Sequence, residues 1–599
     1  MKKTIIGIDL GTTNCTMAYC FLEGNEKEIV QFKIPQVISA NLQDEQFSLP
    51  SFIYFPLKEE LDNQVSKADF TELTNYTIGL FAKNRGEELP NRVIASAKSW
   101  SCFSGIDRRH RFLPLHSEEK ETLLSPMEAC SALLKHLKCA WDFKMPTSLF
   151  NEAEVFITVP ASFDPSAREL IKEAAALAGF PEIVLIEEPL SAFYAWLHRQ
   201  NDNWRDLLRV NDSVLVVDIG GGTTDFSLIS VENEMGDLNL KRVAVGDHLL
   251  LGGDNIDLTL AYFTKAKFED AGHEISDVQF QSLIHVCRQA KEKLLGMDPP
   301  KSVDITLVGK GSKLIGSTLK TKLTLDEVVG LVVDGFFPLV GMEERSETVS
   351  SFGLVEVGLP FAKDPRISCQ LAKFLSVCDN EEEDNSENNS FKLPTAILFN
   401  GGTLKADALR NRLVELLNNW AEKLNKQPIA VLPEPDFDNA VSLGAVYYGL
   451  SRHGLAVRVK SGTARSYYIG VEDSAPAVPG IAKSMKAFCV VPFGMEEGSE
   501  VELSNQEFVL AVGQPAIFRF FSLSAKNLKN GVTPIVGTLV KNIGLELNEL
   551  HSIETTLEKN DLGRMVRVKL KSKVTELGFL ELWCVADETN KWKLEFDVR

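Results

Sequence analysis

The sequence lacks several patterns that mark common kinds of site. Its ten cysteines form no C-x-x-C pair, so nothing points to a zinc site or a dithiol motif, and free thiols in a reducing compartment are expected. It also contains no G-x-x-x-x-G-K-[ST] segment, and residues 309–311 fail that pattern. A P-loop nucleotide site is therefore excluded.

Long apolar runs are missing as well. No stretch reaches the length of a membrane span, and the apolar run behind Lys2 and Lys3 stops at Asp9, too early for the core of a signal peptide. We therefore predict a cytoplasmic protein that does not associate with membranes. A secretion signal of another type stays open.

Basic residues are fewer than acidic ones. The chain of 599 residues has 63 Lys and Arg against 83 Asp and Glu, which gives a formal net charge of −20. Binding to a phosphate backbone needs a basic surface, so nucleic acid is not expected as a partner. The length and a hydrophobic share of 44% predict a folded protein of several domains.

Two glycine-rich turns, far apart in the sequence, share one pattern. In residues 6–16 and again in residues 216–226, an apolar strand ends on an aspartate, a Gly/Thr turn follows and a second strand leaves. Glycine lets the backbone of such a turn approach a ligand, and its amide groups can form a concavity that binds anions. A single turn of this kind is typical of an ordinary β-hairpin. Two copies, each with a pair of threonines, predict two facing half-sites for phosphate groups.

The aspartates of these turns, Asp9 and Asp218, predict a metal ion. A triphosphate carries several negative charges, so two carboxylates beside it would repel it unless a hard divalent cation lay between them. Mg²⁺, which usually keeps part of its water shell, is the expected cation.

The pair of turns resembles the phosphate motifs of the actin, hexokinase and heat-shock ATPase superfamily. Residues 1–14 closely resemble the start of the DnaK-type seventy-kilodalton heat-shock chaperones, and the resemblance runs through residues 1–450. It implies an α/β fold: a two-lobed, actin-like ATPase domain with duplicated ribonuclease-H-like cores that binds ATP or ADP with Mg²⁺.

The resemblance also implies roles for single residues. Lys98 matches the family lysine that orients the attacking water, and Glu188, followed by Pro189, matches the glutamate that holds the metal's water. By itself, a lysine on a helical stretch is typical of a solvated surface. The implied catalytic residues are Lys98, Glu188, Asp218 and Thr223, and the implied metal ligands, acting through water, are Asp9, Asp218 and Asp225.

The implied nucleotide-binding residues lie in the two turns and in three later segments. The turns contribute Gly11, Thr12, Thr13, Asn14, Gly220, Gly221 and Gly222. Segments that resemble the family's G-D and L-G-G-x-D motif, its adenosine-contacting helix and its diglycine turn contribute Gly252, Gly253, Lys291, Gly401, Gly402, Thr403 and Lys405. The first of these motifs begins with Gly246 and Asp247.

The adenosine-contacting helix departs from the family pattern E-x-A-K-R-x-L-S. Arg288 stands in place of the Glu, Glu292 in place of the Arg and Leu295 in place of the Ser. The arginine that would stack on a purine and the serine that would bond its edge are thus both missing. The preference for adenine stays open, whereas the phosphate end of the predicted site is intact.

Two further residues match a family relay between nucleotide and second domain: Pro160, which follows a buried-type strand, and Arg168, on the next helix. From the residues alone they would be a helix entry and a surface charge.

Local sequence marks three helix starts. Residues 125–128 and 324–327 are capping boxes, and the second is predicted to open a helix that runs to about Phe336. Asp164 is the predicted N-cap of the third helix.

The rest of the chain is divided by composition. Residues 451–465 form a basic linker where the family has an acidic, leucine-rich one, so coupling between domains is not assured. Residues 466–599 alternate with period two, as at Val566, Val568 and Leu570, which predicts an antiparallel β domain in the place of the family's substrate-binding β-sandwich. The chain ends directly after a strand, so no helical lid is expected. The acidic segment 379–387 is predicted to be a solvated loop.

The function that this resemblance implies is a slow, Mg²⁺-dependent ATPase of the chaperone type. It would couple its nucleotide state to the binding of unfolded or extended polypeptide by the β domain, with a co-chaperone as a further partner. One alternative is a nucleotide-gated exchange factor or binding protein with little hydrolysis. Another is a small-molecule kinase of the same superfamily, which phosphorylation of a sugar would reveal.

Overall fold

The computed structural model describes most of the chain between residues 4 and 597. The residues left out inside that range are 24–26, 63–69, 71–74, 104, 116, 118, 120–121, 162, 235–236, 247–248, 309–317, 347–360, 378–391, 435, 460–462, 464, 473–484, 497, 504–505, 525–533, 542, 544–546, 551, 558–564 and 576–578. Asp247, the acidic segment 379–387 and part of the basic linker therefore lie outside the described residues.

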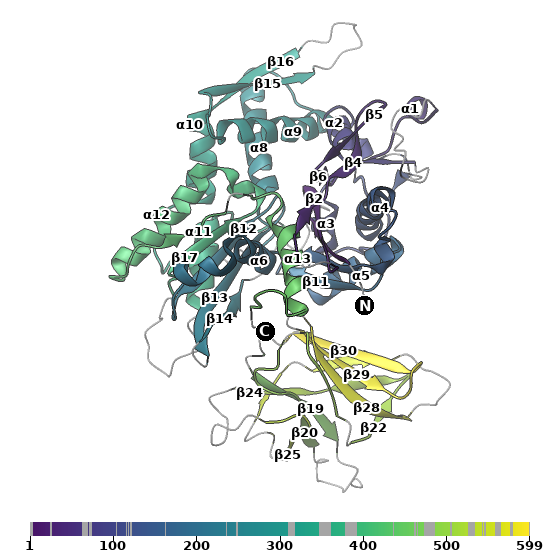
Figure 1. Cartoon of the computed structure of the whole chain (residues 1–599). Helices are drawn as coiled ribbons and strands as arrows, with labels where there is room; N and C mark the ends of the chain where they lie inside the picture. Colours follow the sequence, from purple (N-terminus) through teal and green to yellow (C-terminus); the bar gives the residue numbers. More distant parts are fainter. Residues whose placement is uncertain are drawn as a thin grey trace, which may run out of the picture. The chain divides into compact units, whose positions relative to one another are not determined.

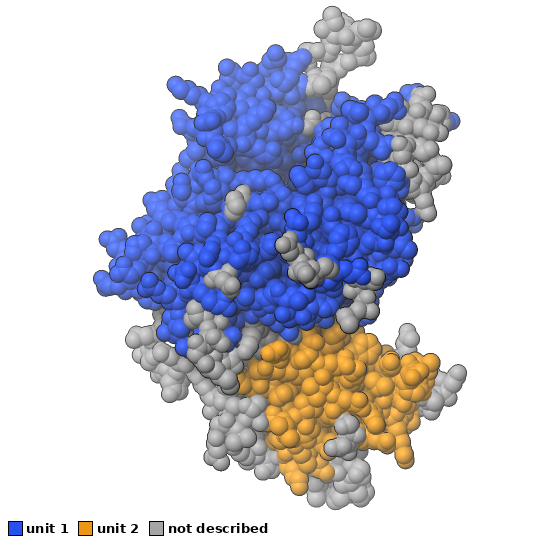
Figure 2. Space-filling view, viewed as in Figure 1, with its two compact units in different colours: residues 1–458 blue, residues 459–599 orange. Residues whose placement is uncertain are grey.

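The chain divides into two compact units, residues 1–458 and residues 459–599 (Figure 2). The division falls inside the segment 451–465 that the sequence marks as a linker. The first unit contains every residue of the predicted nucleotide site, and the elements described in the second unit are β-strands.

The first large sheet of unit 1 contains the first glycine turn. Its strand order is β11-β10-β1-β2-β3, with β6 beside β2. The strands are β1 (Thr4–Leu10), β2 (Asn14–Phe21), β3 (Val30–Gln31), β6 (Ser48–Pro50), β10 (Glu154–Val159) and β11 (Ile183–Glu187). β1 pairs antiparallel with β2 and parallel with β10. The turn therefore connects two neighbouring strands inside the sheet, at the end where β1 finishes and β2 begins.

The second large sheet contains the second glycine turn. Its strand order is β14-β13-β12-β17-β18. The strands are β12 (Ser213–Ile219), β13 (Thr224–Glu234), β14 (Asp237–Val245), β17 (Ala396–Asn400) and β18 (Ala430–Val431). β12 is buried along its whole length, as expected for a strand covered on both faces, and it pairs antiparallel with β13 and parallel with β17. The two sheets thus repeat one plan: a hairpin beside a parallel strand.

Helices cover these sheets (Figure 1). The core of the second sheet is shared with α8 (Gly253–Asp270), α9 (Asp277–Leu294), α11 (Ile367–Val377) and α12 (Asp407–Lys423). In the first half of the unit, α4 (Pro126–Lys144) packs against α5 (Pro165–Leu177). The predicted capping box at residues 125–128 and the N-cap Asp164 are both confirmed.

The helix start at residues 324–327 is also confirmed, and the helical segment continues to Phe336 as predicted, with a π-helical stretch inside it. The capping box opens α10 (Leu325–Val328), and the chain then follows a π-helix, η5 (Val329–Asp334). This π-helix contains Gly330, a residue of low helix propensity.

A close helix pair links the halves of unit 1. α6 (Glu188–Gln200) packs against α13 (Ala440–Arg452), which also lies on β1, β2 and β10. A Cβ atom at Gly444 would lie 1.7 Å from the carbonyl oxygen of Ser191, so only glycine permits this approach. The absence of a side chain at Gly444 therefore allows α13 to pack closely on α6.

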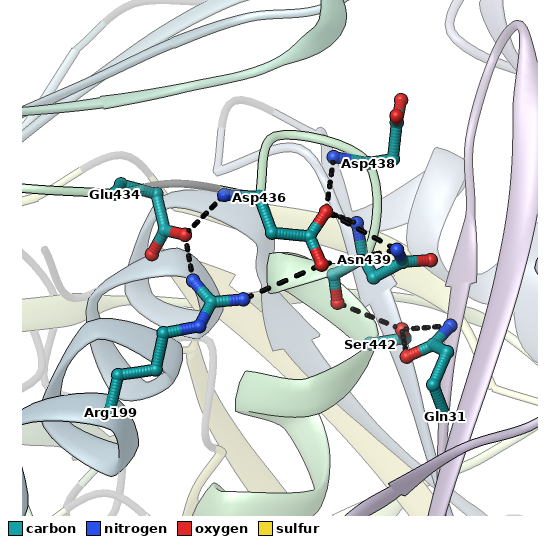
Figure 3. Close-up of polar contacts among 7 residues, drawn as sticks. All are labelled: Gln31, Arg199, Glu434, Asp436, Asp438, Asn439 and Ser442. Carbon is teal, nitrogen blue, oxygen red and sulfur yellow. Dashed lines mark hydrogen bonds and ion pairs between the residues drawn. The ribbon is translucent and has the colours of Figure 1, made fainter.

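Polar side chains fix the start of α13 (Figure 3). Asp436 accepts hydrogen bonds from the backbone N–H groups of Asp438 (3.1 Å) and Asn439 (3.0 Å). Arg199, at the end of α6, forms ion pairs with Glu434 and with Asp436. These contacts tie the two helices together at one end.

Unit 2 contains two five-stranded antiparallel sheets. The first, in the order β25-β20-β19-β24-β26, consists of β25 (Leu539–Val540), β20 (Met485–Val491), β19 (Arg465–Glu472), β24 (Phe520–Ser524) and β26 (Asn548–Glu549). The second consists of β21 (Glu500–Glu502), β28 (Met565–Val574), β29 (Phe579–Val585) and β30 (Lys591–Asp597), with β22 (Phe508–Ala511) beside β28.

Side chains from both sheets of unit 2 form one apolar core. On β28, Val566, Val568 and Leu570 are buried while Arg567 and Lys569 are exposed, which confirms the period-two prediction. No helix in the described part of the chain is long and apolar enough to cross a membrane.

Candidate functional site

The two predicted aspartates end equivalent strands. Asp9 lies near the end of β1, where it accepts a hydrogen bond of 2.9 Å from the hydroxyl of Thr158. Asp218 lies near the end of β12, where it accepts one of 2.8 Å from the side-chain amide of Asn400. Asp225, the third predicted metal ligand, pairs with Asp218 across the hairpin. Each turn thus presents an aspartate supported by the neighbouring parallel strand.

Lys98 and Glu188 form an ion pair beside these aspartates. Lys98 lies on the short helix α3 (Ala97–Ser101) with 5% of its side chain exposed, and its Nζ contacts Oε1 of Glu188, the first residue of α6. The interpretation of Lys98 as a solvated surface lysine is therefore wrong. Its charge also interacts with that of Asp9. The structure brings the predicted catalytic lysine and glutamate together.

Burial, together with the charge of neighbouring carboxylates, raises the pKa of both aspartates. Burial and then the charge of Glu188 raise the pKa of Asp9 to about 7, although Lys98 and Thr158 act in the opposite direction. Burial, followed by Glu188, Asp225 and Asp9, raises the pKa of Asp218 well above its ordinary value, while Asn400 lowers it. Such a set of buried carboxylates favours a bound cation.

The buried carboxylates supply oxygen atoms of the kind that a hydrated Mg²⁺ ion needs. Among the residues that the structure describes, no three His, Cys, Asp or Glu side chains are placed to hold a metal ion together. Oxygen ligands that act through water suit Mg²⁺, which gives up its water shell reluctantly. Asp9, Asp218 and Asp225 are the residues that would hold it.

The tips of the two glycine turns lie against each other. A Cβ atom at Gly221 would lie 2.2 Å from the hydroxyl oxygen of Thr13, and one at Gly222 would lie 3.1 Å from Thr12. Only glycine at these positions lets the turns approach so closely. The tips of the two turns therefore meet, and phosphate binding between them stays a prediction.

The later glycine segments converge on the second turn. The backbone N–H of Gly253 donates to the carbonyl oxygen of Gly220 at 3.0 Å, and the hydroxyl of Thr403 donates to the same oxygen at 2.8 Å. A Cβ atom at Gly252 would lie 2.7 Å from the carbonyl oxygen of Gly221. A Cβ atom at Gly402 would meet nothing within 4 Å among its described neighbours, so this position borders open space.

Further residues of the two turns, and Lys405, contact neighbouring protein atoms. Gly11 approaches its own turn so closely that a Cβ would lie 2.2 Å from the carbonyl oxygen of Asn14. The hydroxyl of Thr224 donates to Leu251, and Thr223 accepts from the N–H of Gly220 at 3.0 Å. Lys405 lies half exposed and pairs with Asp438 at 2.5 Å.

The three residues that depart from the family pattern, at and just after the end of α9, lie in three different environments. Arg288 contacts Asp254 and Asp257, each at 2.6 Å, and Lys291 contacts Asp257 at 2.7 Å. Leu295 is buried in the core of the second sheet, and Glu292 is exposed. Arg288 is thus held by carboxylates of α8 and Leu295 by apolar neighbours.

The predicted relay residues lie in a buried ionic network. Arg168 is buried and donates to the carbonyl oxygen of Ala161, next to Pro160, at 3.1 Å. Its guanidinium also lies 3.7 Å from Glu187, whose other carboxylate oxygen contacts Arg242 of β14. The interpretation of Arg168 as a surface charge is therefore wrong.

Sequence reasoning missed Thr158, Asn400, Glu187 and Arg242. Thr158 and Asn400 are polar residues at the ends of otherwise apolar strands, and that position is a sign that could have found them. Glu187 and Arg242 come together only when the two sheets meet, so nothing local in the sequence marks them.

Comparisons with known proteins show which family the chain resembles. A family model described as Hsp70 protein matches residues 5–332. Chaperone protein DnaK of Psychrobacter cryohalolentis is 26% identical over 297 residues, which cover 48% of this chain and 42% of that protein. A Chaperone protein HscA homolog of Acinetobacter baumannii is 29% identical over 343 residues, covering 55% of this chain and 47% of the relative. These matches span less than half the length of the curated relatives.

The family match includes both glycine turns, the Lys98–Glu188 pair and helix α9. The mixed α/β sheets of unit 1 agree with the actin-like fold that this family's ATPase domain implies. The family model matches more than half of the residues of this chain. The chain therefore belongs to the Hsp70 family, as a divergent member.

Proposed function

We propose that the protein is a slow, Mg²⁺-dependent ATPase of the heat-shock chaperone type that couples its nucleotide state to the binding of unfolded or extended polypeptide. The observation that carries this proposal is the meeting of two glycine turns, with Asp9 and Asp218 beside the Lys98–Glu188 pair. A cytoplasmic location stays a prediction from the sequence.

Hydrolysis by such a site depends on positioning and charge stabilisation more than on covalent chemistry. Amide groups of the two turns would bind the phosphates. Lys98, fixed by its ion pair with Glu188, would orient the attacking water molecule. Mg²⁺, bound through water, would neutralise charge that develops on the phosphate oxygens.

We assign polypeptide binding to residues 459–599. Apolar side chains lie on the surface of this unit: Val509 is 60% exposed, Ile517 63% and Met565 63%. An antiparallel sheet with such side chains is suited to an extended segment, whose own side chains alternate with period two. A co-chaperone is a further expected partner.

A second candidate function is a nucleotide-gated exchange factor with little hydrolysis. The buried Leu295 and the carboxylate-bound Arg288 favour it, because neither side chain is placed to hold a base as the family pattern does. A small-molecule kinase is the third candidate, and it predicts transfer of phosphate to a sugar instead of to water.

Single-turnover hydrolysis of ATP tests the proposal. Lys98→Ala should slow hydrolysis at least about 100-fold, as loss of one well-placed charge-stabilising group does. Lys172→Ala, which changes a lysine 36% exposed on α5, is the matched control and should hydrolyse ATP like the parent. Equal rates for Lys98→Ala and the parent would contradict the catalytic assignment. Tight binding without hydrolysis by the parent would favour the exchange factor.

A further inference from the structure

The strand neighbours of the two aspartates occupy equivalent places. Thr158 lies opposite Asp9 in the parallel pair β10 and β1, and Asn400 lies opposite Asp218 in the parallel pair β17 and β12. In both pairs a neutral side chain donates a hydrogen bond to the aspartate. A neutral donor stabilises the ionised carboxylate without adding charge.

Asn400 differs from Thr158 in having an acceptor atom that is separate from its donor atom. Its side chain is 1% exposed, and its Nδ2 donates to Oδ2 of Asp218 at 2.8 Å. Its other atom, Oδ1, is buried and has no hydrogen-bond partner among the described residues. A buried acceptor without a donor costs free energy, so such an atom calls for a ligand.

The surroundings of Asn400 narrow the kind of ligand. An amide oxygen accepts hydrogen bonds or binds a hard cation. Asp218 and Asp225 are close to each other, and Asp9 and Glu188 add further negative charge. A negatively charged environment favours a cation or the polarised water molecules that surround one.

The geometry also fixes Asp218 from its other side. Gly401 follows Asn400 and adopts φ +89°, and a Cβ atom there would lie 2.6 Å from Oδ1 of Asp218. One carboxylate oxygen therefore lies against Gly401 while the other is held by Asn400. Asn400 and Gly401 together leave Asp218 little freedom to turn.

We propose that Asn400 is a positioning residue of the magnesium site: its Nδ2 holds Asp218, and its Oδ1 accepts a hydrogen bond from the water shell of Mg²⁺. This inference rests on the proposed nucleotide site and names a residue on which that site's use of metal depends. A neighbour that hydrogen-bonds a metal-linked carboxylate typically changes metal affinity 10- to 100-fold.

A purely structural role makes a different prediction. β17 is buried along its whole length, so a leucine of similar size at position 400 would suit the core by burial alone. If Asn400 only fills space, its replacement should affect binding of ADP equally with and without Mg²⁺. If it positions the metal, only the part of the affinity that depends on Mg²⁺ should fall.

Calorimetric titration of the full chain with ADP, in Mg²⁺ and in EDTA, separates these roles. The variants are Asn400→Leu, which removes donor and acceptor, and Asn400→Thr, which copies the donor found at Thr158. Asn411→Leu, on the exposed face of α12, is the matched control. Circular dichroism and thermal unfolding verify that each variant is folded.

We expect Asn400→Leu to lose about 10-fold or more of the Mg²⁺-dependent gain in ADP affinity, with ADP binding in EDTA unchanged. Asn400→Thr should recover part of that gain, and Asn411→Leu should match the parent. An unchanged gain in Asn400→Leu overturns the inference, as does an equal loss in Mg²⁺ and EDTA. If Asn400→Leu does not fold, Asn400→Ala, which also removes donor and acceptor, takes its place, and an unchanged gain in that variant overturns the inference.

The same experiment keeps the two proposals apart. Absence of ADP binding by the parent, in Mg²⁺ and in EDTA, would contradict the proposed function itself. ADP binding by the parent with the same dependence on Mg²⁺ in Asn400→Leu would contradict only the role of Asn400.

Discussion

Arg242 of β14 contacts Glu187 at the end of β11, and this ion pair joins the second sheet of unit 1 to the first. Both side chains are buried, at 5% and 0% exposure. A shift in the pairing of β13 with β14 lies beside Arg242, and such a bulge changes the direction of a side chain. Glu187 is also the neighbour of Glu188 in sequence, so the pair lies directly beside the candidate site.

We predict that Arg242→Gln speeds release of ADP. If ADP leaves when the two sheets move apart, this movement breaks the buried Arg242–Glu187 ion pair in the parent but not in the variant. Loss of one partner should also lower the free energy of unfolding by about 3 kcal/mol, since Glu187 stays buried. Stopped-flow displacement of a fluorescent ADP analogue measures the release rate.

Lys241→Gln is the control for this prediction. Lys241 is the neighbouring residue on β14, and its ion pair with Glu232 is 43% and 47% exposed. Exposed pairs contribute little, so this variant should behave like the parent. Equal release rates for Arg242→Gln and Lys241→Gln would show that the buried pair does not hold the sheets together.

Acid should destabilise the protein through His136 of α4. Burial lowers the pKa of His136 to about 4 from an ordinary value of 6.5, and the backbone carbonyl of Pro35 contacts its Nε2 at 3.0 Å. Between pH 6.5 and 4 the unfolded state therefore binds a proton that the folded state does not. Stability is full above pH 6.5 and falls as the pH is lowered, by about 1.4 kcal/mol per pH unit at most.

Urea unfolding at a series of pH values checks the role of His136. His136→Gln should reduce the loss of stability between pH 6.5 and 4, because glutamine does not titrate. His285 has the same lowered pKa of about 4 and continues to contribute in that variant. Identical pH profiles for parent and His136→Gln would refute the assignment.

Gly444→Ala should strongly destabilise unit 1. The added methyl group would meet the carbonyl oxygen of Ser191, a backbone atom that cannot turn away. We expect a loss of at least about 3 kcal/mol, beyond the range of ordinary overpacking. Gly330→Ala is the matched control, because a Cβ atom there meets nothing within 4 Å in the described structure. Equal stability of the two variants would contradict the close packing of α6 and α13.

Two substitutions, one on α9 and one at the residue that follows it, separate base recognition from folding. Glu292 is exposed, so Glu292→Arg should fold normally and tighten binding of ADP relative to GDP if an arginine at that position stacks on the base. Leu295 belongs to the core, so Leu295→Ser should lower stability by about 3 kcal/mol. Calorimetry and thermal unfolding measure the two effects. Unchanged nucleotide selectivity in Glu292→Arg would contradict the interpretation of this helix.

The sequence predicted those features that depend on local pattern. The hairpins in which Asp9 and Asp218 precede a glycine turn follow from residue type and spacing. The alternation of buried and exposed side chains on β28 follows from the same kind of pattern. Lys98 and Arg168 were placed only by resemblance to a family, because residue type alone favours a solvated charge. Both are buried by partners distant in sequence.

Other features depend on contacts that one segment cannot specify. Asn400 reaches Asp218 because β17 and β12 pair in a particular register. The assignment of Leu295 to the core depends on the packing of α9 against the second sheet. Register and packing arise from the whole domain, so a residue that acts through them is recognised only in the folded structure.

Calorimetric titration with ADP and Mg²⁺, repeated with GDP, tests the central claim of a working nucleotide site most directly. The account predicts micromolar or tighter binding of ADP that weakens when EDTA removes the metal. Absence of binding of either nucleotide would contradict it, and the function of this chain would then have to be sought in residues 459–599.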